Sequence, residues 1–348
     1  MRADEINLLK TCSLLGVIFS HALLPFTVPG GFWKLFAEQP SLIADRIASC
    51  LGLIIIPSFM LASGYLLART LESKKRSFAE QLANRTKRLL IPWLCMTLFW
   101  LAPLYAFFDL PAYNRPAGLS LLQTYAAGLK GLFCDHLWFL LVLFWASVFW
   151  LAAFPLLKRI GSAGGLALAF AVSWLISRYG RDLTWYALWE TAGPLIYVFL
   201  GIALWTCRER LDVFLKRRAA PVFAVTLLLY ALFASRAELP QILYWIACCA
   251  GALLAYQASL YCSRRWYRGL RGNVFYRYFE DNAFRFYLFH IPGGLLIFKA
   301  LDALTGLSPL PFVLLSFALN LVATTLIVRL VNALEAFVRN LPDKSGKK

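Results

Sequence analysis

Runs of mostly apolar residues, separated by shorter polar stretches, fill the chain from end to end. A helix needs about 20 apolar residues to cross the hydrocarbon core of a bilayer. The pattern therefore predicts an all-α polytopic membrane protein with about ten transmembrane helices. No long connection remains for a separate soluble domain, so we expect one integral-membrane domain over residues 1–348. The predicted spans are about 7–27, 48–68, 89–108, 136–155, 163–179, 184–206, 219–235, 241–262, 284–302 and 308–332.

The composition agrees with this interpretation. Hydrophobic residues make up 60% of the 348 positions and charged residues 15%, against roughly 45–50% and 25% in soluble proteins. The mean hydropathy is +0.65. These values exclude a soluble enzyme, a disordered chain and a secreted disulfide-rich module.

The basic residues indicate an orientation. The chain holds 35 Lys and Arg against 18 Asp and Glu, a net charge of +17. In a soluble protein such an excess is typical of nucleic-acid binding, but in a membrane protein it collects in cytoplasmic loops. With the N-terminus inside, 8 of the 35 lie in outer connections and the other 27 on the cytoplasmic side. We therefore expect a multi-pass protein of the cell inner (plasma) membrane, with both termini cytoplasmic and no nucleic-acid partner.

Ionisable side chains inside spans are costly and usually face the interior of the bundle, so they are the first candidates for function. Lys10 and His21 both lie in the first apolar run. Eleven residues cover about 16 Å of helix and make close to three turns, which places both side chains on one face. Lys10 either binds a cytoplasmic anion or is an interfacial anchor. His21 is either a reactive imidazole past the midplane or a hydrogen-bonded core residue.

Two further motifs flank the second connection. Ser63-Gly64-Tyr65 near the end of the second span offers two hydroxyl groups, although small residues at such positions commonly serve helix packing. Arg85 and Arg88 have a spacing that suits binding of phosphate by two guanidinium groups. The alternative for these arginines is ordinary cytoplasmic charge.

The later spans hold four more polar or amphipathic candidates. His136 and Trp138 open the fourth span, where an interfacial aromatic belt is the alternative. Glu190 lies in the sixth span and is expected to have a histidine, Lys or Arg partner. His290 precedes Pro292, so it either takes part in a site or bridges a helix kink. No metal-binding motif is present, and we predict no metal site.

Taken together, these motifs resemble those of membrane-bound acyltransferase family 3, which includes bacterial O-acetyltransferases of envelope polymers. The topology and length are similar as well. Lys10 stands where an Arg is commoner, and Asn7 where the family often has Asp. The matching motifs are Lys10 with His21, Phe59 followed by Ser63-Gly64-Tyr65, Arg85 and Arg88 followed by Pro92, His136 to Leu140, and Tyr287 with His290.

The resemblance implies transfer of an acyl group, often acetyl, from cytoplasmic acyl-CoA to an acceptor hydroxyl at the outer side. It implies no bound cofactor: acyl-CoA, acetyl-CoA by family default, is a co-substrate. The acceptor would be a glycan or a lipid-linked sugar.

On this view Arg85 and Arg88, with Lys10, hold CoA phosphates. His21 is the general base, or alternatively forms an acyl-histidine intermediate. The remaining candidates for the substrate pocket are Ser63, Tyr65, His136, Trp138, Glu190 and His290. The rival function is a transporter or flippase of a glycan or solute.

Overall fold

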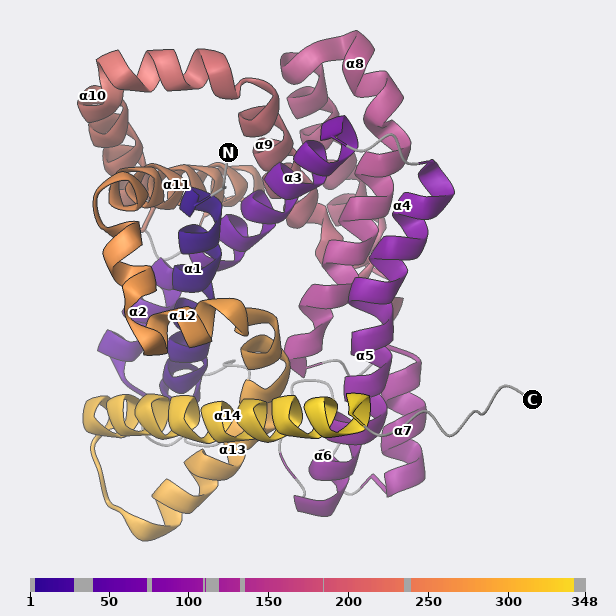
Figure 1. Cartoon of the computed structure of the whole chain (residues 1–348), viewed down its shortest axis with the longest axis vertical. Coiled ribbons are helices and arrows are strands. Elements are labelled where there is room, and N and C mark those ends of the chain that lie inside the picture. Colours follow the sequence, from indigo (N-terminus) through magenta and orange to yellow (C-terminus); the bar gives the residue numbers. More distant parts are fainter. Residues whose placement is uncertain are drawn as a thin grey trace.

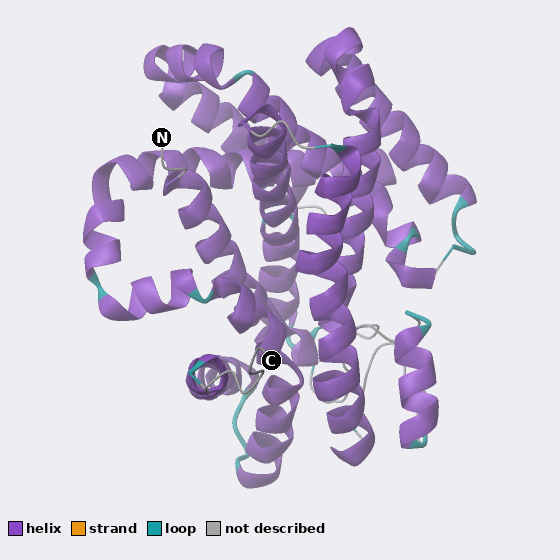
Figure 2. Ribbon diagram, turned by 45° about the vertical axis from the view of Figure 1, so that its right-hand side comes forward, coloured by secondary structure: helices purple, strands orange, loops and turns teal. Residues whose placement is uncertain are grey.

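The computed structural model describes residues 4–27, 40–73, 77–108, 110, 119–131, 135–183, 185–234 and 239–340. Helices joined by short loops make up nearly all of this described part, and it has no strand (Figure 2). The α-helices are α1 (Asp4–Leu23), α2 (Leu42–Gly52), α3 (Ile55–Ser73), α4 (Phe78–Arg85), α5 (Ile91–Met96), α6 (Ala102–Phe108), α7 (Leu121–Leu129), α8 (Trp138–Tyr179), α9 (Ala192–Thr206), α10 (Arg208–Ala234), α11 (Gln241–Gly272), α12 (Val274–Asp281), α13 (Ala283–Leu304) and α14 (Pro309–Arg339).

The all-α polytopic fold is confirmed. Within the described residues, eight helical segments are long and apolar enough to cross a membrane. The difference from the ten expected spans has two sources. The expected spans 136–155 and 163–179 both belong to α8, and the expected span 219–235 corresponds to a shorter apolar helix, Ala220–Ala234, within α10.

The 42-residue element α8 is two arms rather than one rod. At Gly161 the backbone leaves helical geometry with φ 66°, a left-handed value that glycine adopts without the steric penalty of a Cβ atom. Figure 1 shows α8 folding back at the upper edge of the molecule. The two predicted apolar runs are therefore separate arms joined by a turn at Gly161.

The segment from α4 to α6 contains two π turns, η2 (Thr86–Leu90) and η3 (Thr97–Leu101). The turn η2 ends two residues before Pro92, and η3 ends two residues before Pro103. The N–H groups of Ile91 and Ala102 donate to carbonyls five residues back, and the prolines themselves have no N–H to donate. The sequence expectation began this span at residue 89, whereas the helical column begins at Phe78 and runs down one side of Figure 1.

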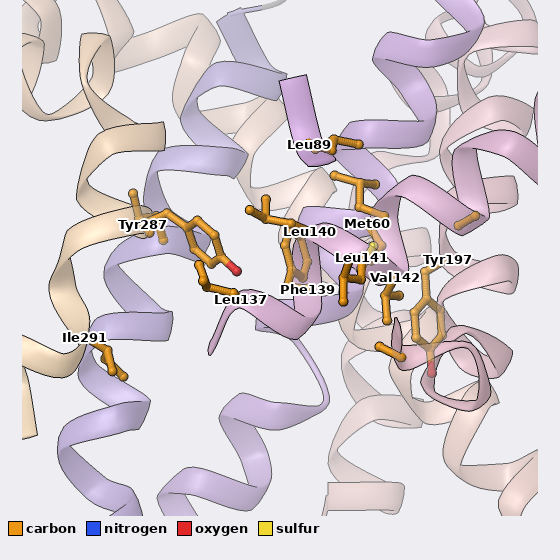
Figure 3. Packing of buried hydrophobic residues seen from close by; sticks show 14 of the residues in the cluster. Met60, Leu89, Leu137, Phe139, Leu140, Leu141, Val142, Tyr197, Tyr287 and Ile291 are labelled. Carbon is orange, nitrogen blue, oxygen red and sulfur yellow. The ribbon is translucent and has the colours of Figure 1, made fainter. Parts of the chain in front are cut away.

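Glycines allow α3 and α9 to touch backbone to backbone. A Cβ atom at Gly64 would lie 1.9 Å from the carbonyl oxygen of Val198, and one at Gly201 would lie 1.9 Å from that of Leu61. Membrane helices use small residues in this way because the close approach gains dispersion contacts. Figure 3 shows part of the buried hydrophobic core, to which Met60 of α3 and Tyr197 of α9 both belong.

Candidate active site

The three histidines come from distant parts of the chain and converge. His21 lies in the last turn of α1, His136 in the 3-10 turn η4 (Asp135–Leu137), and His290 in α13. The ring centroids of His21 and His290 are 5.1 Å apart with nearly parallel planes, and those of His136 and His290 are 5.0 Å apart. His290 is therefore the middle member of a histidine cluster.

A helix break in α13 explains where His136 binds. The backbone turns extended at Ile291, directly before Pro292. Proline has no N–H, so the carbonyl of Leu288, four residues earlier, lacks the usual helical donor. The ring Nε2 of His136 lies 3.2 Å from that oxygen. Of the two alternatives for His290, a site residue or a bridge across the kink, the second falls to His136, which takes the carbonyl that the proline leaves open.

The hydrogen bonds assign a tautomer to the His21 ring and to the His290 ring. His290 Nδ1 lies 2.7 Å from the carbonyl oxygen of Tyr287, which can only accept, so Nδ1 carries the hydrogen. In the neutral ring His290 Nε2 is then an acceptor, and His21 Nδ1, 3.0 Å away, must donate to it. The neutral His21 ring consequently has its lone pair on Nε2, the state required of a general base.

The three histidine rings differ in how deeply they are buried. His136 and His290 are buried, with 4% and 0% exposure, whereas His21 is only partly buried. His136 Nε2 must donate to the Leu288 carbonyl, so its Nδ1 holds a lone pair, and this buried atom has no hydrogen-bond partner among the described residues. Of the three histidines, His21 is the one whose side chain keeps some exposed surface.

Lys10 lies in the second turn of α1, within electrostatic range of an acid that the sequence did not single out. The carboxylate of Glu280 in α12 attracts the Lys10 ammonium group. Glu280 also accepts a hydrogen bond of 2.7 Å from Tyr267 and pairs with Arg271 at 3.0 Å. Glu280 thus forms a charged cluster between α11 and α12, and Lys10 of α1 lies within its electrostatic range.

Arg85 and Arg88 do not present equivalent guanidinium groups. Arg85 ends α4 and is partly buried, whereas Arg88 lies in the π turn η2 and is exposed. The sequence interpretation of their spacing assumed that both side chains lie on a regular α-helix. The π turn winds the chain differently, so that spacing does not hold here. Within the described part of the chain no ion pair joins either arginine to an acid.

Ser63 and Tyr65 contact other groups than the histidines. The Ser63 hydroxyl donates to the carbonyl of Phe59 within its own helix at 2.9 Å. Tyr65 donates to Glu5 at 3.4 Å and packs edge-on against Trp205. These contacts serve helix packing near the start of α1, and the structure brings neither residue into contact with the histidine cluster.

Trp138 and Glu190 also stand apart from the cluster. Trp138 begins α8 and packs against the ring of Phe139. Glu190 lies in the 3-10 turn η6 (Trp189–Thr191), and its buried Oε2 atom has no hydrogen-bond partner in the described part of the chain. The histidine, Lys or Arg expected beside Glu190 is absent among the residues described. The side chain of Asp135, next to His136, lies outside the described residues.

A family model for an acyltransferase domain matches residues 4–329. The chain belongs to acyltransferase family 3. This acyltransferase is thus a membrane enzyme of the class that the resemblance implied, and membership favours acyl transfer over the transporter or flippase alternative. No curated protein and no solved structure matches the chain significantly.

Two further residues of the acyltransferase support the histidine cluster: Tyr287, which the sequence offered only as part of the motif with His290, and Trp100, which it did not single out. Tyr287 supplies the carbonyl that orients His290, and its hydroxyl donates to the carbonyl of His136. The indole of Trp100 donates to the carbonyl of Ile291 at 2.8 Å, at the break in α13. Pro292 was a usable signal, because a proline inside a span requires donors from other helices. Nothing in the sequence indicates which residues supply them.

Proposed function

We propose that this acyltransferase moves an acyl group, acetyl in the simplest case, from cytoplasmic acyl-CoA to a hydroxyl group of an envelope glycan or related acceptor, with His21 as the general base. The observation that carries the proposal is the hydrogen-bond chain from the Tyr287 carbonyl through His290 to His21. It holds the His21 ring in the tautomer whose Nε2 accepts a proton, on the one cluster histidine that keeps an exposed surface.

The reaction balances with these groups alone. As the acceptor oxygen attacks the thioester carbonyl, its proton passes to His21 Nε2. The new C–O bond forms and the C–S bond breaks. The CoA thiolate then takes the proton from the imidazolium, which regenerates the neutral ring. His290 stabilises the transient charge on His21 by accepting its Nδ1 hydrogen.

The proposed orientation places the start of α1 in the cytoplasm and the histidine cluster towards the outer face of the inner membrane, with both termini cytoplasmic. Its support is the distribution of Lys and Arg. In this orientation Arg85 and Arg88 lie on the cytoplasmic part of their helix and, with Lys10, bind the phosphates of CoA. Two arginines with no acidic partner among the described residues suit a polyanionic ligand.

The test of the general base uses purified protein in proteoliposomes, acetyl-CoA and a sugar acceptor. His21→Ala should lower transfer by a factor of about 10²–10⁴, the usual contribution of a general base. Ser20→Ala is the matched control, because the Ser20 hydroxyl donates to the carbonyl of Val17 within the same helix. Full activity of a folded His21→Ala enzyme would refute the proposed mechanism.

The donor site is tested separately by calorimetry with CoA. The double variant Arg85→Ala/Arg88→Ala should bind CoA at least tenfold more weakly. Arg265→Ala, an exposed arginine of α11, should bind CoA like the wild type. Unchanged affinity in the double variant would remove these arginines from the donor site and leave the role of His21 untouched.

A further inference from the structure

The indole of Trp100 contacts α13 on both sides of His290. Its ring packs edge-on against the ring of Phe289, with centroids 5.4 Å apart, and its N–H donates to the carbonyl of Ile291 at 2.8 Å. Trp100 lies in the π turn η3, 191 positions before Ile291 in the chain. One side chain from a distant helical column therefore holds both chain neighbours of the central histidine.

The break in α13 makes its backbone depend on donors from other helices. The helical hydrogen-bond ladder is interrupted where Ile291 turns extended, and the following Pro292 has no N–H to donate. At membrane depth, carbonyls beside such a break are satisfied by groups of neighbouring helices. His136 supplies one such donor, and Trp100 supplies another, to Ile291 itself. The peptide groups around the break are thus fixed from outside α13.

The π turn η3 fixes the direction in which this part of the column faces. Four buried residues follow one another here at a spacing of four, namely Trp93, Thr97, Leu101 and Tyr105. In a regular α-helix that spacing would rotate the buried face by about 120° over the run. The π turn takes one more residue into its turn, which reduces the rotation to about 20°. One face of the column therefore stays against the bundle at the level from which the partly buried Trp100 contacts α13.

The His290 ring passes this constraint on to His21. Its Nδ1 donates to the carbonyl of Tyr287 at 2.7 Å, and its Nε2 accepts from His21 Nδ1 at 3.0 Å. Both bonds require the ring to keep one direction, because hydrogen bonds weaken steeply as their angle departs from linear. A rotation of the backbone at Ile291 would tilt the His290 ring and bend its bond to His21.

We infer that Trp100 is a positioning residue of this acyltransferase. It holds the backbone of α13 at the break, the backbone holds the His290 ring, and that ring keeps the neutral His21 ring in the tautomer with its lone pair on Nε2. The inference rests on the proposed function for its effect on the rate, because His21 is there the general base. The positioning itself concerns the tautomers of two rings, which can be measured without turnover.

The first measurement reads the tautomers by solid-state nitrogen NMR of the full-length protein in lipid bilayers. The chain has only three histidines, so isotope labelling of their ring nitrogens gives three rings, assigned from variants that lack one histidine each. At mildly alkaline pH the rings are neutral. In the wild type His21 and His290 should carry the hydrogen on Nδ1, and His136 on Nε2. In Trp100→Phe, which loses the indole N–H, His21 and His290 should populate both tautomers while His136 keeps its own.

The second measurement is steady-state kinetics with a matched control. Trp100→Phe should lower kcat by about tenfold, a typical loss when an outer orienting partner is removed, and should leave the KM for acetyl-CoA unchanged. Trp150→Phe is the control, because it removes the same kind of contact between α8 and α9. The indole of Trp150 donates to the carbonyl of Leu195 at 3.0 Å, and its ring packs against Phe199. This variant should keep the wild-type tautomers and kcat.

A second replacement covers the case in which Trp100→Phe does not fold. Benzothienylalanine at position 100 keeps the double ring and has sulfur in place of the N–H, so the same results are expected. Wild-type tautomers in a folded protein without this N–H would overturn the inference, whatever happens to kcat. Mixed tautomers with a lower kcat would support it. Mixed tautomers with full kcat would support the role of Trp100 and refute His21 as the base, so the two proposals fail separately.

Discussion

His21 donates from Nδ1 to Nε2 of His290 at 3.0 Å, although 269 positions separate them in the chain. The bond joins the last turn of α1 to the turn of α13 that precedes its break at Ile291. Because His290 is itself fixed by the Tyr287 carbonyl, the direction of the His21 ring depends on backbone geometry in α13.

The first prediction concerns His290 as a positioning residue. His290→Leu removes the acceptor for His21 Nδ1 and should lower kcat by about 100-fold, because loss of an orienting partner leaves the ring free to adopt other tautomers and directions. His290→Gln keeps an amide oxygen that can accept this hydrogen, so it should recover much of the activity.

Steady-state kinetics with acetyl-CoA check this prediction. The KM for acetyl-CoA should stay constant in both variants, because the donor site lies elsewhere. Equal losses of kcat in folded His290→Leu and His290→Gln enzymes would show that His290 does not act through this hydrogen bond.

The second prediction concerns Lys10 and its acidic neighbour. If Lys10 binds a CoA phosphate, Lys10→Gln should raise the KM for acyl-CoA several-fold with little change in kcat. Glu280→Gln should shift KM in the opposite direction, because it removes a negative charge that attracts the ammonium group and repels the phosphate. Increasing salt should reduce both effects if the contacts are solvent-accessible. A KM that neither variant changes would make Lys10 a structural member of its cluster.

The third prediction concerns the His136 contact with α13. His136→Phe leaves the Leu288 carbonyl without its donor, since Pro292 cannot supply one. The loss of a partner for a buried carbonyl should destabilise the protein by about 1–3 kcal/mol. Thermal unfolding in detergent measures this change. His136→Gln, which can place an amide N–H near the carbonyl, should unfold at a higher temperature than His136→Phe. The reverse order would contradict the assignment.

The sequence predicted the helical membrane fold well because each apolar run carries its own signal. Its errors were local. Ala220–Ala234 is shorter than a typical span, and the expected spans 136–155 and 163–179 are two arms of α8 joined directly by the turn at Gly161. Helical periodicity assumed regular α-helix at Arg85 and Arg88 and could not foresee the π turn that starts at Thr86.

For the candidate site, the small number of histidines in the sequence was a useful guide. Only three histidines occur, all near apolar spans, and the structure brings all three together. Spacing could not reveal which ring contacts which, because those contacts are between segments far apart in the chain. For Tyr65 the sequence was a poor guide. Its hydroxyl group was predicted to line the substrate pocket, but it donates a hydrogen bond to Glu5 of α1. Hydroxyl groups on helices have many local acceptors, so their presence predicts little about a pocket.

The fourth prediction concerns the contact between α3 and α9. Gly64→Ala would place a Cβ atom 1.9 Å from the Val198 carbonyl oxygen, and Gly201→Ala would meet the Leu61 carbonyl oxygen at the same distance. Backbone atoms cannot move aside as a side chain end can, so the helices must separate. Each variant should lose about 1–3 kcal/mol or more and unfold at a lower temperature. The double variant should cost less than the sum of the two single losses, because one separation of the helices accommodates both methyl groups.

Gly269→Ala in α11 is the control, since a Cβ atom there meets nothing within 4 Å and alanine favours the helix by up to about 1 kcal/mol. Unfolding of Gly64→Ala at the wild-type temperature would show that α3 and α9 do not approach this closely.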